Sequence, residues 1–302
     1  MSRHVAVLMG GWSAEREVSL VSGAAAGEAL RIRGYRVSEI DVKRDLPQRL
    51  AELEPDVVYN ALHGRFGEDG AVQGLLEIMG IPYTHSGVLA SSLAMNKAMA
   101  KRLFVSAGLR SPEGYVTTVD ALKNGAPPMS PPYVIKPNNE GSSVGVQIVR
   151  SSQERPLARN DWPFGPEVLV ERYVPGRELT VAVLGDRPLT VTEIRPRHGF
   201  YDYHAKYTEQ AADHLIPAPI PEVLYEQALA DAQAAHRLLG CRGVSRADFR
   251  LDDTEPDGLY LLEVNTQPGM TPLSLVPEQA AHVGIGFADL VVQLVEGARC
   301  DT

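Results

Sequence analysis

Short apolar runs alternate with amphipathic stretches over the N-terminal part of the chain. The runs cover residues 4–9, 36–42 and 56–62. Such runs are typical of strands buried on both faces, as in a parallel sheet. Between the first two, residues 15–31 repeat apolar side chains at helical spacing. The alternation of strands and helices predicts a doubly wound, Rossmann-like α/β domain over residues 1–92.

Turn-forming residues follow two of these predicted strands. The first run ends in Gly10-Gly11, and the third is followed by His63-Gly64. In open α/β sheets, ligands bind beyond the carboxyl ends of the strands. The pattern therefore indicates a binding site at this edge of the sheet.

The middle of the chain predicts a smaller α+β domain over residues 93–175. Residues 93–105 have helical spacing, and residues 125–132 contain four prolines, which exclude regular structure. Strands are expected over residues 133–137, 146–149 and 167–174.

The last part of the chain, residues 176–302, predicts two hairpins and two helices. Gly185-Asp186 separates two apolar strands, as expected of a tight hairpin. The strands of the two hairpins are expected at residues 178–184 with 188–194, and 247–251 with 259–264. The helices are expected at residues 222–239, where Gly240 ends the helix, and 288–296.

The second of these hairpins has candidate metal ligands. Side chains alternate with period two along a strand, so antiparallel pairing can bring Asp248, Glu263 and Asn265 together. Three oxygen donors, two of them anionic, suit a hard cation such as Mg²⁺. A solvated strand face with incidental charge would look similar, but the whole set favours a metal site. The same alternation predicts that Tyr260, Leu262 and Val264 share the opposite face.

Two further segments are suited to binding a nucleotide. Lys136 ends an apolar strand, and residues 138–145 after it are rich in Gly, Ser and Asn. A loop of this kind can cover phosphates with N–H groups and hydroxyls, although many such loops are only connections. Within residues 171–178 a strand runs into Pro175-Gly176. This hinge could present backbone groups to an adenine, or be an ordinary linker. The chain has neither a Walker pattern nor a G-x-G-x-x-G after its first strand.

Composition narrows the classes of function. The 302 residues allow two or three domains, and the net charge of −9 includes no block of basic residues that would favour nucleic acid. Cys241 and Cys300 provide neither a disulfide framework nor a metal spacing. No apolar run of 18 residues and no signal-like segment is present. We therefore expect a cytoplasmic protein that binds no membrane.

Ordered blocks along almost the whole chain resemble the D-alanine–D-alanine ligases. They occur in the family's order and are the residues 9–19, 61–64, 67–70, 82–84, 136–137, 140–145, 201–207, 262–265, 267–271 and 274–277. The chain departs from the family's usual pattern at Trp12, Asn96, Asn138-Asn139 and a short segment 151–166. The resemblance implies the ATP-grasp fold, with ATP held between the central and C-terminal parts.

The resemblance also implies roles for residues at the matching positions. Glu15 would hold the ammonium group of the first D-alanine, with His63 close by. Ser142 and Tyr207 would form a hydrogen-bonded trio with Glu15. The residues implied for ATP are Lys97 and Lys136 at the phosphates, Lys206 at the transferring group, Glu171 and Val174 at the adenine, and Glu178 at the ribose.

The remaining implied roles concern the metal and the second substrate. Asp248, Glu263 and Asn265 would bind two Mg²⁺ ions, for which Mn²⁺ could substitute. Arg246 and the backbone N–H of Gly269 would stabilise an oxyanion. Ser274 and Leu275 would anchor the carboxylate of the second D-alanine.

The expected activity is therefore ATP-dependent ligation of two D-alanines through an acylphosphate, for peptidoglycan precursor synthesis, by a homodimer. A D-alanine–D-lactate ligase, another carboxylate–amine ligase of this fold, and a non-catalytic nucleotide-binding protein remain alternatives. Tyr207 favours an amine acceptor over D-lactate.

Overall fold

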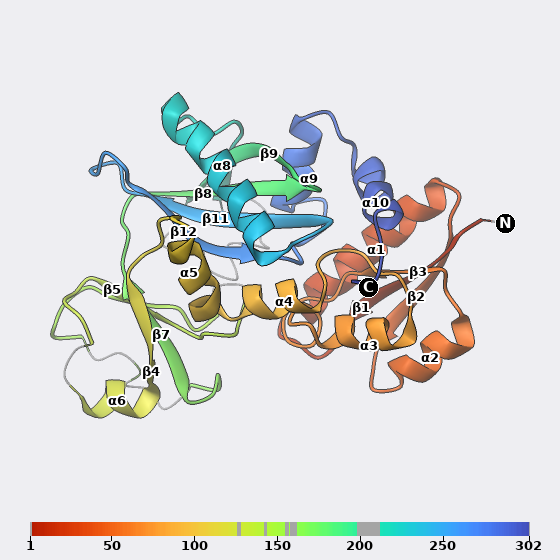
Figure 1. Ribbon diagram of the computed structural model, residues 1–302, viewed down its shortest axis with the longest axis horizontal. Helices are drawn as coiled ribbons and strands as arrows, with labels where there is room; N and C mark the ends of the chain where they lie inside the picture. Colours follow the sequence, from red (N-terminus) through yellow and green to blue (C-terminus); the bar gives the residue numbers. More distant parts are fainter. Residues whose placement is uncertain are drawn as a thin grey trace.

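The protein is elongated, with an α/β unit at one end and two further sheets beside it (Figure 1). A computed structural model describes residues 2–125, 128–141, 144–154, 157, 162–197 and 212–301. Within these ranges, none of the helices has both the length and the apolar composition needed to cross a bilayer.

The N-terminal unit contains a parallel sheet, as predicted, and its strands have the order β2-β1-β3. The strands are β1 (His4–Gly10), β2 (Arg36–Val42) and β3 (Val57–Asn60). Their side chains are almost completely buried in β1 and β3, which explains the near-continuous apolar runs.

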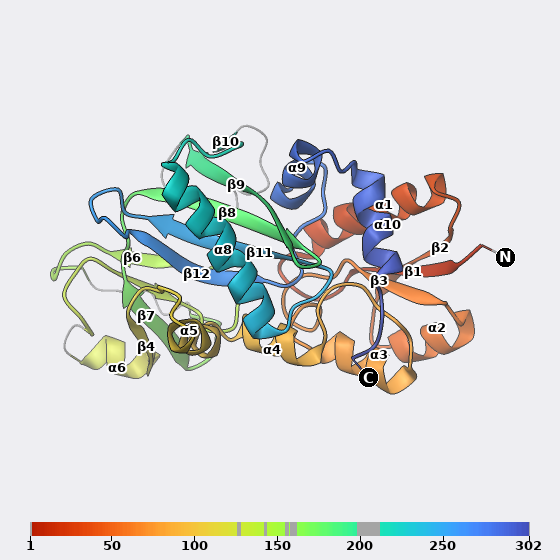
Figure 2. The ribbon, with the colours of Figure 1, turned by 45° about the horizontal axis from the view of Figure 1, so that its top comes forward.

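Helices cover both faces of this sheet. The face of Val5 and Val7 packs against α1 (Arg16–Ile32) and α10 (Phe287–Glu296). The opposite face packs against α2 (Leu46–Leu53) and α3 (Ala71–Met79), which lie side by side in Figures 1 and 2. The sheet thus has the doubly wound arrangement that the sequence predicts.

The C-terminal helix α10 belongs to the core of the N-terminal sheet, although the two are at opposite ends of the sequence. Leu290, Leu294 and Val295 are buried in one cluster with Ala26 and Leu30 of α1. The chain beyond α10 then pairs with the same unit through an antiparallel bridge between Arg299 and Tyr83. The first and last segments therefore stabilise each other.

We expect Leu294→Ala to destabilise the whole protein for this reason. Leu294 is 2% exposed, and shortening a buried leucine side chain to alanine lowers the free energy of unfolding by about 2–5 kcal/mol. Urea unfolding followed by circular dichroism measures the change. Leu89→Ala is the matched control, because Leu89 is 68% exposed and should change stability by less than about 0.5 kcal/mol. Equal effects of the two substitutions would contradict the shared core.

The prediction of a single helix over residues 93–105 is wrong. The structure has two helices, α4 (Val88–Met95) and α5 (Lys97–Ser106), separated at Asn96. Asn96 has an extended backbone, and its side chain accepts a hydrogen bond of 3.1 Å from the N–H of Met99. Asparagine favours such a cap over a place inside a helix.

An antiparallel four-stranded sheet in the order β4-β7-β5-β6 follows. Its core includes Tyr133, Ile135, Val168 and Val170. Its elements are β4 (Gly114–Thr118), α6 (Val119–Asn124), β5 (Tyr133–Lys136), β6 (Gln147–Val149) and β7 (Glu167–Arg172).

A five-stranded antiparallel sheet in the order β10-β9-β8-β11-β12 forms the third unit. Leu184 pairs with Arg187 across the predicted tight hairpin. Helix α8 crosses one face of the sheet and shares its core with α4 and α5 (Figure 2). The elements are β8 (Arg177–Leu184), β9 (Arg187–Pro196), β10 (Ala212–Leu215), α8 (Glu222–Leu239), β11 (Val244–Leu251), β12 (Leu259–Asn265) and α9 (Leu275–His282). The domain borders after residues 92 and 175 stay predictions.

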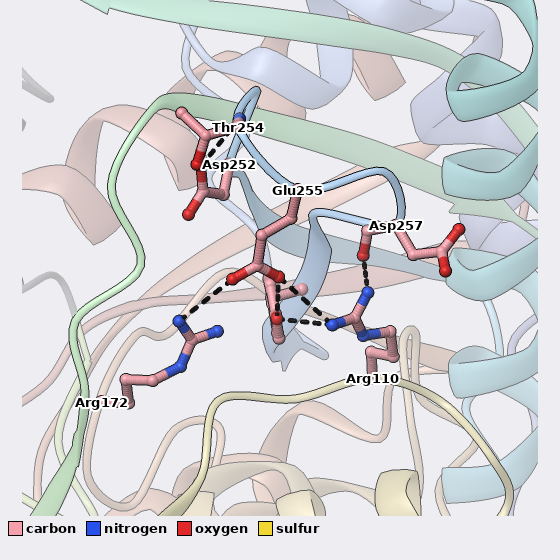
Figure 3. A network of polar contacts seen from close by, with 7 residues as sticks. Arg110, Arg172, Asp252, Thr254, Glu255 and Asp257 are labelled. Carbon is pink, nitrogen blue, oxygen red and sulfur yellow. Dashed lines mark hydrogen bonds and ion pairs between the residues drawn. The ribbon is translucent and has the colours of Figure 1, made fainter.

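A polar network joins the four-stranded sheet to the β11–β12 loop (Figure 3). The guanidinium groups of Arg110 and Arg172 lie 4.5 and 4.7 Å from the ring centre of Tyr260. Glu255 forms an ion pair with each arginine, at 3.3 and 3.4 Å, and accepts a hydrogen bond from Tyr260 at 2.5 Å. The network connects the end of β7 to the strands that carry the candidate metal ligands.

Candidate functional site

The candidate metal ligands lie where β11 and β12 pair. Asp248 is opposite Glu263, and Arg246 is opposite Asn265, so the hairpin brings the three oxygen donors together as the sequence predicts. A β-bulge follows immediately, because Phe249 pairs with Leu261. Bulges are frequent beside active sites, where they redirect a side chain.

The bulge makes the predicted grouping of Tyr260, Leu262 and Val264 wrong. Val264 joins the apolar core with Leu261, whereas Leu262 and Glu263 line one pocket. Strict alternation holds only within a regular ladder, and the extra residue in β12 shifts it by one position.

Positive groups accompany both carboxylates. Arg246 donates two hydrogen bonds to Asp248, at 2.8 and 2.7 Å, and Lys97 lies 3.2 Å from Glu263. The amide oxygen of Asn265 accepts a hydrogen bond of 2.8 Å from the N–H of Gln267, which fixes its orientation. All the donors are hard oxygen atoms, as Mg²⁺ prefers, and each is partly exposed to the pockets. The residues therefore fit a Mg²⁺ site completed by ligands from a substrate.

A first pocket lies between the N-terminal unit and the five-stranded sheet. It is lined by many of the predicted site residues, namely Glu15, His63, Lys97, Glu178, Arg246, Asp248, Glu263, Asn265, Gly269, Ser274 and Leu275. The sequence distance between Glu15 and Leu275 shows that the fold, not local sequence, assembles this pocket.

The N-terminal wall of the first pocket holds two buried carboxyl groups and a histidine. A Cβ atom at Gly141 would lie 3.2 Å from Glu15 Oε2 and 3.3 Å from Glu68 Oε1, so both carboxyl groups face that glycine. Burial, and then the charge of Glu15, raise the pKa of Glu68 well above its usual range. Burial lowers the pKa of His63, whose Nδ1 lies 3.1 Å from the carbonyl oxygen of Gln267.

Glu68 was not among the residues singled out from the sequence. It lies in the block 67–70, which carries part of the family resemblance, so a signal was present. Nothing local showed that it would be buried beside Glu15.

The opposite wall of the pocket is the start of helix α9. Ser274 precedes the helix with an extended backbone, and Leu275 is its first residue. The Oγ of Ser274 accepts a hydrogen bond of 3.0 Å from the N–H of Thr271, and a Cβ at Gly269 would lie 3.0 Å from that Oγ. A helix N-terminus presents free N–H groups and partial positive charge, so this wall suits a carboxylate.

A second pocket lies between the four-stranded and five-stranded sheets. It is lined by the predicted residues Lys97, Lys136, Glu171, Val174, Glu178, Asp248 and Glu263. Its apolar lining includes Val134, Ile148 and Leu262. An apolar chamber with lysines at one end suits a base and its phosphates.

The charged end of the second pocket contains a buried trio. Glu171 contacts Lys136 at 2.5 Å and also forms an ion pair with Lys101. Burial alone would raise the pKa of Glu171, but the two lysines outweigh it and lower that pKa below its usual value. Lys101 was not singled out from the sequence, because its position on α5 gives no hint that it meets β5 and β7.

Three predicted site residues lie outside the described part of the chain: Ser142, Lys206 and Tyr207.

Comparison with known proteins places this architecture in a family. The sequence model described as D-ala D-ala ligase C-terminus matches residues 110–296, and that described as D-ala D-ala ligase N-terminus matches residues 46–86. This chain belongs to the D-alanine–D-alanine ligase family.

Individual relatives support the family assignment over the full length. A D-alanine–D-alanine ligase of Paramagnetospirillum magneticum is 59% identical, with all of both chains covered. One of Parvibaculum lavamentivorans is 58% identical over 99% of each chain. The crystal structure of a Bacillus anthracis D-alanine–D-alanine ligase complexed with ATP matches with a TM-score of 0.81 at 31% identity, covering 98% of this chain and 97% of that one. The predicted ATP-grasp fold is thereby confirmed.

Proposed function

We propose that this protein joins two D-alanine molecules into D-alanyl-D-alanine at the expense of ATP, for peptidoglycan precursor synthesis. One observation carries the proposal: the two pockets meet at the candidate metal ligands. Lys97, Glu178, Asp248 and Glu263 line both pockets. A nucleotide in the second pocket would therefore direct its terminal phosphate at a substrate in the first.

The nucleotide would be bound between the four-stranded and five-stranded sheets. Glu171 and Val174 would border the adenine, and Glu178 would hold the ribose hydroxyls. Lys97 and Lys136 would contact the phosphates, and Lys206 the transferring group. Charge on the equatorial oxygens of that group requires cations around it.

Asp248, Glu263 and Asn265 would hold two Mg²⁺ ions. Bound there, the ions would neutralise phosphate charge and fix the phosphates in line with the acceptor. Lys97 and Arg246 already balance the carboxylates, so the chain's own cations keep these side chains in place.

The first D-alanine would bind at the N-terminal wall. Glu15 would hold its ammonium group, with His63 beside it, while Ser142 and Tyr207 complete the hydrogen-bonded trio. The carboxylate of this D-alanine would then face the candidate metal ligands. Phosphorylation makes this carboxylate a good acyl donor, because phosphate leaves far more readily than oxide.

The second D-alanine would bind at the start of α9, where Ser274 and Leu275 receive its carboxylate. Its neutral amine attacks the acylphosphate, and a tetrahedral oxyanion forms before phosphate leaves. Arg246 and the N–H of Gly269 would stabilise that charge. Two Arg246 N–H groups are held by Asp248, which fixes the guanidinium plane toward the pocket. Fixed donors of this kind avoid reorganisation during the reaction.

We expect ATP-dependent phosphate release with D-alanine and not with L-alanine. The amino acid must place its ammonium group at Glu15 and its carboxylate at the candidate metal ligands. With both groups in place, L-alanine would direct its methyl group to a position where D-alanine has hydrogen. A coupled phosphate assay with each enantiomer, and chromatography of the product, measure this. Adding D-lactate distinguishes the rival depsipeptide ligase: ester as the main product would overturn the proposed acceptor. Equal release with both enantiomers would overturn the proposed substrate.

Two properties complete the proposal. The enzyme would act in the cytoplasm, where ATP is available, and it would be a homodimer, as the family resemblance implies. Light scattering at several protein concentrations measures the mass of the assembly.

A further inference from the structure

A third pocket in the N-terminal unit is separate from the two pockets of the proposed reaction. It opens beyond the carboxyl ends of β1, β2 and β3 and has a volume of about 410 Å³. This volume is within the range of about 300–1,000 Å³ that small-molecule sites occupy. None of the described residues that line the third pocket has a role in the proposed reaction except His63.

The floor of the third pocket is apolar. Leu46, Leu62 and Val72 line it and are buried in the core beneath it. Two exposed aromatic rings stand above this floor: Trp12 and Phe66 form an edge-to-face pair with centres 5.7 Å apart. Such a pair offers a large apolar surface to a flat molecule.

The backbone that positions the ring of Phe66 is strained. Phe66 has φ of +69°, a left-handed conformation that bulky residues rarely adopt. Its N–H donates a hydrogen bond of 2.9 Å to Asp69, which fixes the turn. Rare backbone conformations cluster at ligand clamps, so the strained turn points to binding.

Positive charge surrounds the opening. Lys43, Arg44 and Arg65 line the pocket. The guanidinium group of Arg44 lies 5.9 Å from the ring centre of Trp12, and that of Arg65 lies 5.3 Å from the ring centre of Phe66. No acidic side chain occurs among the described lining residues, and Asp41 near the rim is already held by Arg16 through two bonds of 2.7 Å. An anion at the opening would therefore meet three positively charged side chains and no carboxylate among the described residues that line the pocket.

We infer that the third pocket binds a small anion with an aromatic or apolar body. The body would lie on the floor beneath Trp12 and Phe66, and the anionic group would be held by Lys43 and Arg44. His63 lines both this pocket and the first pocket, so an occupant would contact one face of the wall that separates them.

The fluorescent anion 8-anilinonaphthalene-1-sulfonate tests the inference on the full chain. We expect saturable binding of one molecule per chain that ATP does not displace. The sequence has two tryptophans, so Trp162→Phe leaves Trp12 as the only donor. Exciting Trp12 should then sensitise the emission of the bound dye. Displacement by ATP, or the absence of energy transfer, would place the dye elsewhere and overturn the inference.

Charge dependence provides a second test. The double variant Lys43→Gln/Arg44→Gln should lower the affinity for the dye about tenfold or more, because hydrogen bonds to charged groups contribute strongly. Arg150→Gln/Arg187→Gln is the matched control, since both residues are exposed and neither lines the pocket. The uncharged parent N-phenyl-1-naphthylamine should bind wild type and the double variant equally. Unchanged affinity of the double variant for the anion would overturn the inference, and thermal unfolding of each variant shows that it is folded.

Discussion

Glu263→Gln should reduce D-alanine-dependent phosphate release by about 10²–10³-fold or more, as losing one group that stabilises transition-state charge does. Glutamine keeps the size of the side chain and one oxygen but loses the negative charge that a divalent cation requires. Glu263 also balances Lys97 at 3.2 Å, so the variant leaves a lysine without its carboxylate at the shared edge of the two pockets. Phosphate release is measured at saturating ATP, with and without D-alanine, over a range of Mg²⁺ concentrations.

The Glu263 side chain is 26% exposed, so the substitution should not unfold the protein. Glu226→Gln is the matched control, because Glu226 is exposed on α8, where it lines neither pocket, and should leave turnover unchanged. Thermal unfolding of both variants separates a lost metal ligand from a lost fold. Undiminished turnover of a folded Glu263→Gln protein would show that the metal assignment is wrong.

Much of the fold could be predicted because its determinants are local. The buried parallel strands, the tight hairpin at Gly185-Asp186 and helix α8 each follow from a periodicity with turn residues at its ends. The exceptions have definite causes. Asn96 divides one apolar stretch into two helices by capping the second, and the bulge after Asp248 moves Leu262 to the face of Glu263.

The site could be predicted only in part. Strand alternation predicts that antiparallel pairing can bring Asp248 and Glu263 together, and the structure pairs these two residues directly. Glu68 and Lys101 are different, because each acquires its place through contacts across distant elements. No local pattern encodes the burial of a carboxyl beside Glu15 or of a lysine beside Glu171.

Glu171→Gln should lower the free energy of unfolding by about 3–5 kcal/mol, the typical cost of removing one partner from a buried ion pair. Lys101 comes from α5, whereas Lys136 and Glu171 come from β5 and β7. Helix α5 also packs on the five-stranded sheet, so the trio ties that sheet's core to the four-stranded sheet. Without the carboxylate, two lysines with side chains only 8% exposed would face each other unpaired. Urea unfolding measures the loss.

Glu255→Gln is the matched control, since Glu255 also lies between two cations but its side chain is 34% exposed. An exposed arrangement contributes about 0–1 kcal/mol, so this variant should remain close to wild type. The pKa of Glu171 is lowered in the folded state, so its contribution is present above the pKa of the unfolded chain. That contribution is lost as the pH falls through the lowered pKa, and the difference between wild type and Glu171→Gln should shrink on acidification. A loss no larger than that of Glu255→Gln, or a difference that grows in acid, would contradict the stabilising role of the trio.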